Sequence, residues 1–215
     1  MIKLFEQFNN EQEIHDICKE YNIKNYTINL DGSIDVNGNV RLSCQALSSI
    51  PLKFNKVSGY FYINDNFLRN LNNCPKEVGG EFDCSGNYIT SLVGGPEFVG
   101  EEYNCSFNSL TTLEGSPMDI HEDFNCRNNK LTTLKGGPLR ISSEFVLKRN
   151  PIKIVDSSIE FSTIDIADTE FPIQIQLLNM KKIRILFEHG VDYDIFRKDG
   201  SVNHKRLERL FKDFE

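Results

Sequence analysis

Histidines, cysteines and paired carboxylates are the residues of this 215-residue chain that could bind a metal or carry out catalysis. The four histidines lie in four different segments, at His15, His121, His189 and His204. His121 is followed by Glu122 and Asp123, but no nucleophile recurs at a matching position. This pattern favours a surface histidine over a catalytic one.

The short motifs that signal catalysis or cofactor binding do not occur in the sequence. It contains no Walker loop and no G-x-G-x-x-G, H-E-x-x-H or G-x-S-x-G segment. Glu101 and Glu102 are adjacent, so in a strand they point to opposite sides and do not form a catalytic pair. The G-G-x-G-x-D calcium repeat is missing as well. We therefore predict that the protein is not an enzyme and needs neither a metal nor a cofactor.

Three of the six cysteines, Cys84, Cys105 and Cys126, follow one another at intervals of 21 residues. Elsewhere the same position is filled by larger apolar residues, at Leu42, Ile63 and Leu147. Such a position requires a buried small apolar side chain. Disulfides and a metal site are the alternatives, but no histidine or acid shares this column and the spacing is not C-x-x-C. We predict free structural thiols.

The cysteine spacing belongs to a 21-residue repeat, which occurs in six copies over residues 36–155 without an insertion or deletion. One apolar column consists of Val40, Phe61, Phe82, Tyr103, Phe124 and Phe145. A polar column consists of Gln45, Asn66, Asn87, Asn108, Asn129 and Asn150. Further apolar columns begin at Val36, Leu47 and Ile50, and a proline column begins at Pro75.

Each column has a physical interpretation in a stack of parallel strands spaced about 4.8 Å apart. The apolar residues alternate with exposed ones, as in a half-buried strand. An inward asparagine amide carries both a donor and an acceptor, so it can bond backbone groups of its own rung and of the next rung. Losing one amide should cost about 1–3 kcal/mol. Glycine and proline in the returns, as in VGGPEFVG, disfavour helix and predict a flat solenoid.

The pattern F/Y-x-C-x-x-N-x-L-x-x-L resembles the leucine-rich repeat, LxLxxNxLxxL, over residues 36–155. Its short length and its proline are similar to the bacterial subclass, which implies a recognition module. The segments CSGNYITSLVGGP, CSFNSLTTLEGSP and DGSIDVNGNV also resemble bacteriophage leucine-rich repeat proteins. That resemblance, and not the periodicity, implies a phage origin.

The two ends are expected to cover the stack. We assign residues 1–35 to an N-terminal cap, 36–155 to about six repeats, and 156–215 to degenerate rungs and a helical cap. Asn10 with Glu13 predicts a helix start, and the apolar face consists of Ile14, Ile17, Cys18 and Tyr21. An edge strand should contain Ile28, Leu30 and Ile34. Asn37-Gly38 fits a hairpin turn, but its register with Val57-x-Gly59 favours the repeat.

The C-terminal region contains two further helix signals. Pro172 should open a helix that Gly190 ends. A turn at Lys198–Gly200 should lead to a last helix from about Asn203. Its apolar residues, which we expect to pack on the stack, are Leu207, Leu210, Phe211 and Phe214.

Side chains between the buried strand positions should form the exposed strand face, where leucine-rich repeat proteins usually bind their partners. The candidate binding residues are Tyr60, Tyr62, Glu81, Asp83, Glu102, Asn104, Phe107, Asp123, Asn125, Arg127, Lys148 and Arg149. Exposed aromatic residues often dominate interfaces, so Tyr60, Tyr62 and Phe107 are the expected anchors.

Charge is unevenly distributed over these repeats, although the chain as a whole carries a net charge of -7. Residues 77–126 contain ten acids and no lysine or arginine, whereas residues 127–153 contain seven basic residues and the single acid Glu144. Stacked carboxylates repel one another at a mild cost, which is compatible with selection for a binding surface. The alternative is a solvated face that keeps sheets from pairing edge to edge. The acidic total disfavours nucleic acid as a partner.

We therefore predict a binding module that contacts a protein partner, as a phage factor that binds or inhibits a host defence protein. A structural or self-assembling component is the first alternative. The second is a nucleotide- or small-molecule-binding inhibitor of host signalling, suggested by the basic cluster. No apolar run approaches the roughly 20 residues that span a bilayer, and MIKLFEQFNNEQE lacks the features of a secretory signal. We expect a cytoplasmic monomer or weak oligomer that does not bind membranes.

Overall fold

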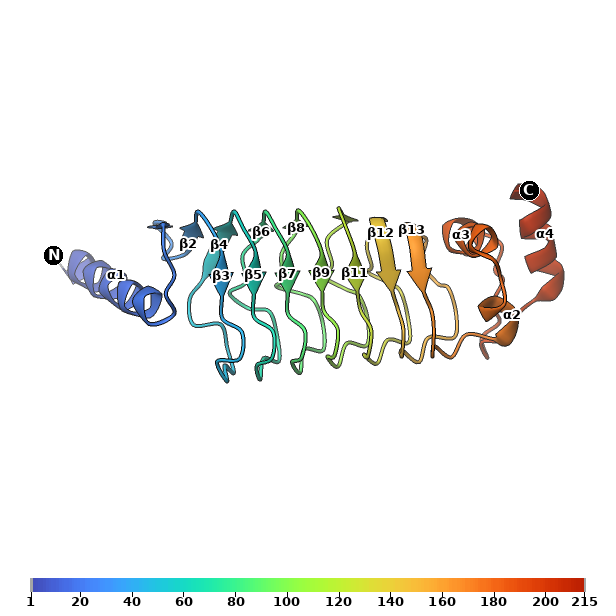
Figure 1. Cartoon of the computed structure of the whole chain (residues 1–215), viewed down its shortest axis with the longest axis horizontal. Coiled ribbons are helices and arrows are strands. Elements are labelled where there is room, and N and C mark those ends of the chain that lie inside the picture. Colours follow the sequence, from blue (N-terminus) through green and yellow to red (C-terminus); the bar gives the residue numbers. More distant parts are fainter. Residues whose placement is uncertain (1, 215) are drawn as a thin grey trace.

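A computed structural model describes the backbone of residues 2–214 and the side chains of residues 11–214. The chain forms a parallel β-solenoid of about six turns, stacked in an almost straight row (Figure 1). Sequence order is therefore spatial order along the stack. The predicted repeat solenoid with parallel strands is therefore confirmed.

Each turn contributes two short strands, which form two sheets along the stack. Sheet A contains β1 (Tyr26–Ile28), β2 (Ile34–Val36), β4 (Phe54–Val57), β6 (Glu77–Val78) and β8 (Phe98–Val99). Sheet B contains β3 (Val40–Arg41), β5 (Phe61–Tyr62), β7 (Phe82–Asp83), β9 (Tyr103–Asn104), β11 (Phe124–Asn125), β12 (Arg140–Val146) and β13 (Glu160–Asp165). β10 (Asp119–Ile120) has the repeat position of a sheet A strand and pairs with β12. Pairs such as Phe82 with Tyr103 place residues 21 positions apart side by side.

The interior of the stack is built from the predicted apolar columns. Phe61, Phe82, Tyr103, Phe124 and Phe145 are all fully buried. Neighbouring rings in this column contact one another, with centroids 6.1 Å apart for Phe61 and Phe82 and 4.8 Å apart for Phe82 and Tyr103. Each turn therefore buries its apolar side chains against the same positions of the next turn.

Tyr103 is the one tyrosine in this phenylalanine column, and its buried hydroxyl has no hydrogen-bond partner among the described residues. The hydroxyl lies 3.1 Å from where a Cβ of Gly95 would be, so the glycine leaves it room. Burying an unbonded hydroxyl destabilises the folded state. We expect Tyr103→Phe to raise the free energy of unfolding by about 1 kcal/mol in urea titration. A loss of stability would mean that the hydroxyl has a partner.

The predicted asparagine ladder is confirmed, and its bonds run to the preceding turn. Asn108 Nδ2 donates to the carbonyl of Cys84 at 3.0 Å and to that of Cys105 at 3.2 Å, while its Oδ1 accepts from the N–H of Ile89 at 2.9 Å. The same pattern recurs at Asn66, Asn87, Asn129 and Asn150. Gln45 is exposed instead, because the column ends at this turn.

The return segments between strands contain turns and bends but no helix, as predicted. Two corners of the stack use left-handed backbone, the first in all six turns and the second in four of them. One corner comprises Cys44, Asp65, Gly86, Phe107, Asn128 and Arg149, and the other comprises Asn73, Gly94, Gly115 and Gly136. These corners were not predicted. Gly, Asn and Asp, the residues that best tolerate positive φ, fill all four positions of the second corner and three of the six positions of the first.

All six cysteines are free thiols, which confirms the prediction. Cys84, Cys105 and Cys126 are buried in one column, and the sulfurs of Cys105 and Cys126 lie 3.6 Å apart. Burial raises the pKa of Cys84 and Cys105 well above the usual thiol value. These side chains therefore act as small apolar residues.

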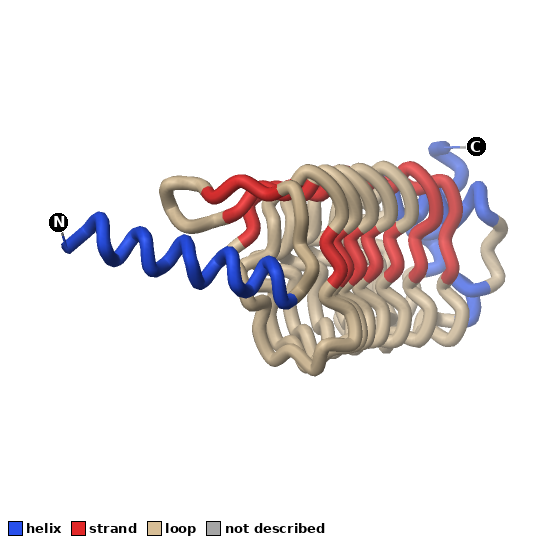
Figure 2. The backbone as a smooth tube through the Cα atoms, turned by 60° about the vertical axis from the view of Figure 1, so that its left-hand side comes forward, coloured by secondary structure: helices blue, strands red, loops and turns tan. Residues whose placement is uncertain are grey.

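The N-terminal end differs from the prediction in two respects. Helix α1 spans Ile2–Glu20, so it begins well before Asn10, whose side chain lies outside the described residues. It projects away from the stack (Figure 2), with Ile14 and Cys18 buried near its C-terminal end. β1 and β2 form an antiparallel hairpin rather than one edge strand, and Leu30 is fully exposed in its turn. Asn37 and Gly38 follow the repeat register, since Val36 pairs with Val57.

The C-terminal end begins with one degenerate rung. β13 pairs with β12, but the offset between partners falls from 20 residues at Arg140 and Glu160 to 19 at Phe145 and Ile164. The expected single helix is divided into α2 (Ile173–Gln176) and α3 (Met180–His189), because Asn179 caps α3 by accepting from the N–H of Lys182. Phe187 of α3 contacts Phe161 of β13 edge to face.

The last helix, α4 (His204–Phe214), follows the predicted turn at Lys198–Gly200. Leu207, Leu210 and Phe211 are buried, whereas Phe214 is partly exposed and stacks on His189 of α3 with centroids 3.9 Å apart. The aromatic ring contacts of α4 therefore reach α3 and the turn that follows it. The prediction that Phe214 packs on the stack is therefore wrong.

Candidate functional site

The outer face of sheet B brings together most of the predicted binding residues. Side chains flanking the buried aromatic column are half-buried here: Tyr60, Tyr62, Glu81, Asp83, Glu102, Asn104, Asp123 and Asn125. The rings of Tyr60 and Tyr62 stack with centroids 4.2 Å apart, and the Tyr62 hydroxyl donates to Glu81 Oε2. This carboxylate raises the pKa of Tyr62. The two tyrosines therefore form a fixed aromatic pair beside the acidic residues.

The centre of this face is a row of acids held one above another by the stack. Glu102 lies in the turn between those of Glu81 and Asp123. Desolvation, followed by the charges of Glu81, Asp123, Asp83 and Glu122, raises the pKa of Glu102 from 4.5 to about 7. The charged form of Glu102 is therefore destabilised on this surface. A positive charge placed next to it would stabilise the carboxylate.

The raised pKa of Glu102 predicts a pH dependence of stability. The folded protein binds this proton more tightly than the unfolded chain does, so the contribution is fully present below about pH 4.5. It is lost as the pH rises through about 7. Discounted for solvent screening, Glu102→Gln should stabilise the fold at pH 8 by on the order of 1 kcal/mol and change little at pH 4.5. Urea unfolding at both pH values measures this, and equal effects at both would contradict the assignment.

Four of the predicted binding residues accept backbone hydrogen bonds, a structural role that was not predicted. Asp83, Asn104 and Asn125 each accept a hydrogen bond from the backbone N–H two residues further on, at 2.8, 3.1 and 3.3 Å. Such bonds fix the turn after the strand. Asp123 Oδ1 likewise accepts from the N–H of Glu144 at 2.9 Å. These side chains therefore support the face as well as lining it.

The remaining predicted residues lie at the corner that follows sheet B. The Arg127 guanidinium lies over the Phe107 ring, 4.9 Å from its centre. Phe107 is exposed and has left-handed backbone, with φ of 53°. This conformation is strained for a bulky residue. Arg127 and Phe107 therefore form an exposed cation–π pair, and Lys148 is half-buried in the turn beyond.

The basic cluster predicted at residues 127–153 is partly neutralised. Arg149 pairs with Asp168 at 3.4 Å, and Lys153 pairs with Glu170 at 3.0 Å. Both acids belong to the degenerate last turn, where the 21-residue spacing is lost. They could not be aligned with their partners from the sequence. These ion pairs weaken the case for a phosphate site at this corner.

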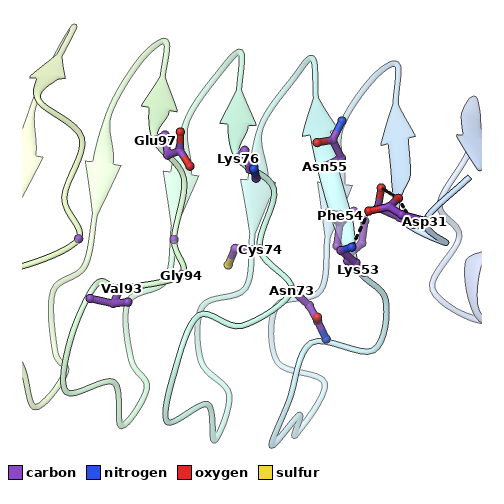
Figure 3. Close-up of a pocket in the computed structure, with 13 residues that line it drawn as sticks. Asp31, Lys53, Phe54, Asn55, Asn73, Cys74, Lys76, Val93, Gly94 and Glu97 are labelled. Atoms are coloured by element: carbon purple, nitrogen blue, oxygen red, sulfur yellow. Dashed lines mark hydrogen bonds and ion pairs between the residues drawn. The ribbon is translucent and has the colours of Figure 1, made fainter. Parts of the chain in front are cut away.

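A groove on the opposite side of the stack was not predicted. Figure 3 shows Asn55, Lys76 and Glu97 in one row, with Cys74 and Gly94 below them. The Lys53 ammonium at its end pairs with Asp31 at 2.5 Å. Gly94, Gly95 and Gly115 line the groove, which has a volume of about 460 Å³. The glycine-rich returns are the sequence signal for this space.

The geometry defines the class of the protein as a parallel β-solenoid with two short strands per turn. Comparison with known proteins adds no relative, since no family model, curated protein or solved structure matches the chain. No helix within residues 2–214 is long and apolar enough to cross a membrane. Among the described side chains, no group of three histidines, cysteines or acids is arranged to hold a metal ion.

Proposed function

We propose that this protein is a non-enzymatic binding module that recognises a protein partner through the outer face of sheet B. The observation that carries the proposal is the row of stacked acids centred on Glu102. Like charges at this spacing destabilise a sheet, and half-burial adds a desolvation cost. A surface whose only task is solubility would place its charges where water screens them.

The corner beside this face supports the same proposal. Phe107 adopts a conformation that costs about 1–3 kcal/mol for a non-glycine residue, although Gly86 occupies the same position one turn earlier. An exposed aromatic ring under an arginine is a common interface anchor. A partner would contact the Tyr60–Tyr62 pair, the acid row and this ring along one side of the stack.

We also propose that the chain belongs to the family that its repeat resembles. We take the asparagine ladder to be that of a short leucine-rich repeat, and the protein to be a cytoplasmic phage factor that binds or inhibits a host protein. Partner capture from bacterial lysate tests the binding proposal. A partner retained by the wild-type chain should be lost by the charge-reversed variant Glu81→Lys with Glu102→Lys.

The sharpest test of the surface uses Phe107→Gly. Because glycine adopts positive φ freely, this variant should be as stable as the wild type or up to about 1 kcal/mol more stable. It should nevertheless bind the captured partner at least about tenfold more weakly. Glu114→Arg, an exposed charge reversal in a return segment, is the matched control and should bind normally. Unchanged binding by both sheet B variants would remove this face as the binding surface.

A further inference from the structure

The outward row of sheet A and its continuation carries an ordered pattern of charge. From turn to turn the exposed side chains are Lys56, Glu77, Phe98, Asp119, Arg140 and Glu160. Their signs run plus, minus, neutral, minus, plus, minus. Within the chain, Lys56 pairs with Glu77 at 2.5 Å, and Arg140 pairs with Glu160 at 3.2 Å.

This row is complementary to itself when a second copy lies against it in the opposite direction. A two-fold axis between the turns of Phe98 and Asp119 places Lys56 opposite Glu160 and Glu77 opposite Arg140. Each contact occurs twice by symmetry. The arrangement therefore has four opposite-charge contacts and no like-charge contact along the row.

Other antiparallel alignments of the same row are poorer. An axis through Phe98 opposes Lys56 to Arg140 and Glu77 to Asp119, which are like charges. Axes between other neighbouring turns give only two opposite-charge contacts. Like-charge contacts across an interface are costly, so the charge pattern selects one register.

Apolar side chains lie beside the central pair of this register, Phe98 and Asp119. Phe98, Met118 and Leu139 are exposed by 44, 58 and 57% of their surfaces. Phe98 and Met118 line a surface hollow of about 410 Å³, together with His121, whose ring lies 5.4 Å from that of Phe98. The charged residues Glu97, Asp119 and Arg140 line the same hollow. In the antiparallel arrangement the partner's Met118 lies closest to the turn of Phe98. An apolar patch enclosed by complementary charges is the usual anatomy of an interface.

From this we infer that the protein forms an antiparallel homodimer through the outward row from Lys56 to Glu160, with its two-fold axis between the turns of Phe98 and Asp119. The occupant of the apolar patch is a second copy of this chain. Six turns at about 4.8 Å give a contact row only about 25 Å long. Such an interface buries an area at the small end of the range for protein–protein complexes, so the dissociation constant should be micromolar. None of the residues of the proposed partner-binding face belongs to this row.

The test is sedimentation velocity over a micromolar concentration series, with charge reversals at one inferred contact. The wild-type protein should shift from monomer to dimer as its concentration rises. Glu77→Arg and Arg140→Glu each create two like-charge contacts, so each variant alone should dimerise at least about tenfold more weakly. An equimolar mixture of the two variants restores both contacts and should form a heterodimer of wild-type affinity.

Rescue on mixing separates the interface from any effect on folding, because only a contact between chains can produce it. Glu114→Arg, outside this row, should dimerise as the wild type does. Thermal melts confirm that each variant is folded. A wild-type chain that stays monomeric throughout the series overturns the inference. Weakened single variants that show no rescue when mixed overturn it as well.

Discussion

Asn108→Ala is expected to lower the free energy of unfolding by about 3 kcal/mol. The substitution leaves the buried N–H of Ile89 without its acceptor. It also removes the donor that reaches the carbonyls of Cys84 and Cys105. Those carbonyls keep second partners, since Cys84 also accepts from Asn87 and Cys105 from Asn129. The stranded N–H and the lost amide bonds therefore account for most of the expected cost.

Gln45→Ala is the matched control, because Gln45 has the same repeat position but is exposed at the end of the column. It should change stability by less than about 0.5 kcal/mol. Urea unfolding followed by circular dichroism measures both variants. Equal losses at the two positions would show that the buried ladder has no special contribution.

Gly115→Ala is expected to destabilise the fold by about 3 kcal/mol or more. Gly115 has φ of +94°, and a Cβ there would lie 2.2 Å from the backbone nitrogen of Val93 in the preceding turn. No real Cβ tolerates that distance, so the stacked corner would have to separate. The change therefore tests how tightly two turns are packed.

Gly94→Ala separates this contact from backbone strain. Gly94 holds the same corner one turn earlier, with φ of +88°, but the nearest atoms to its Cβ position lie at 3.4 Å. Only the left-handed conformation is then unfavourable, which costs about 1–2 kcal/mol. Thermal unfolding of both variants gives the difference. If Gly94→Ala proved as damaging as Gly115→Ala, the close approach of the turns at Gly115 would be wrong.

The solenoid could be predicted because stacking converts a sequence period into a physical contact. Each of the columns at Phe82, Cys84 and Asn87 repeats every 21 residues, so one choice of register explains them all. The inward direction of the asparagines followed from the same argument, since a buried turn must satisfy its backbone groups. The ends carry no such repetition. The early start of α1 and the break between α2 and α3 therefore escaped prediction.

The candidate face was predicted only in part, for a related reason. Periodicity placed Tyr62, Glu81 and Glu102 on one surface, but it could not reveal what each side chain binds. Asp83 accepts a backbone hydrogen bond of its own turn. Arg149 pairs with Asp168, which lies beyond the regular spacing. These contacts depend on rotamers and on the shifted last turn, neither of which the 21-residue period encodes.

The central claim is that successive turns are joined through a buried asparagine ladder, and side-chain amide exchange measured by NMR tests it most directly. The Nδ2 protons of Asn87, Asn108 and Asn129 should exchange slowly, and those of Asn108 should show contacts to both Cys84 and Cys105. The Gln45 amide should exchange rapidly in the same sample. Asparagine amides that exchange as fast as Gln45, without contacts between turns, would contradict the stacked structure.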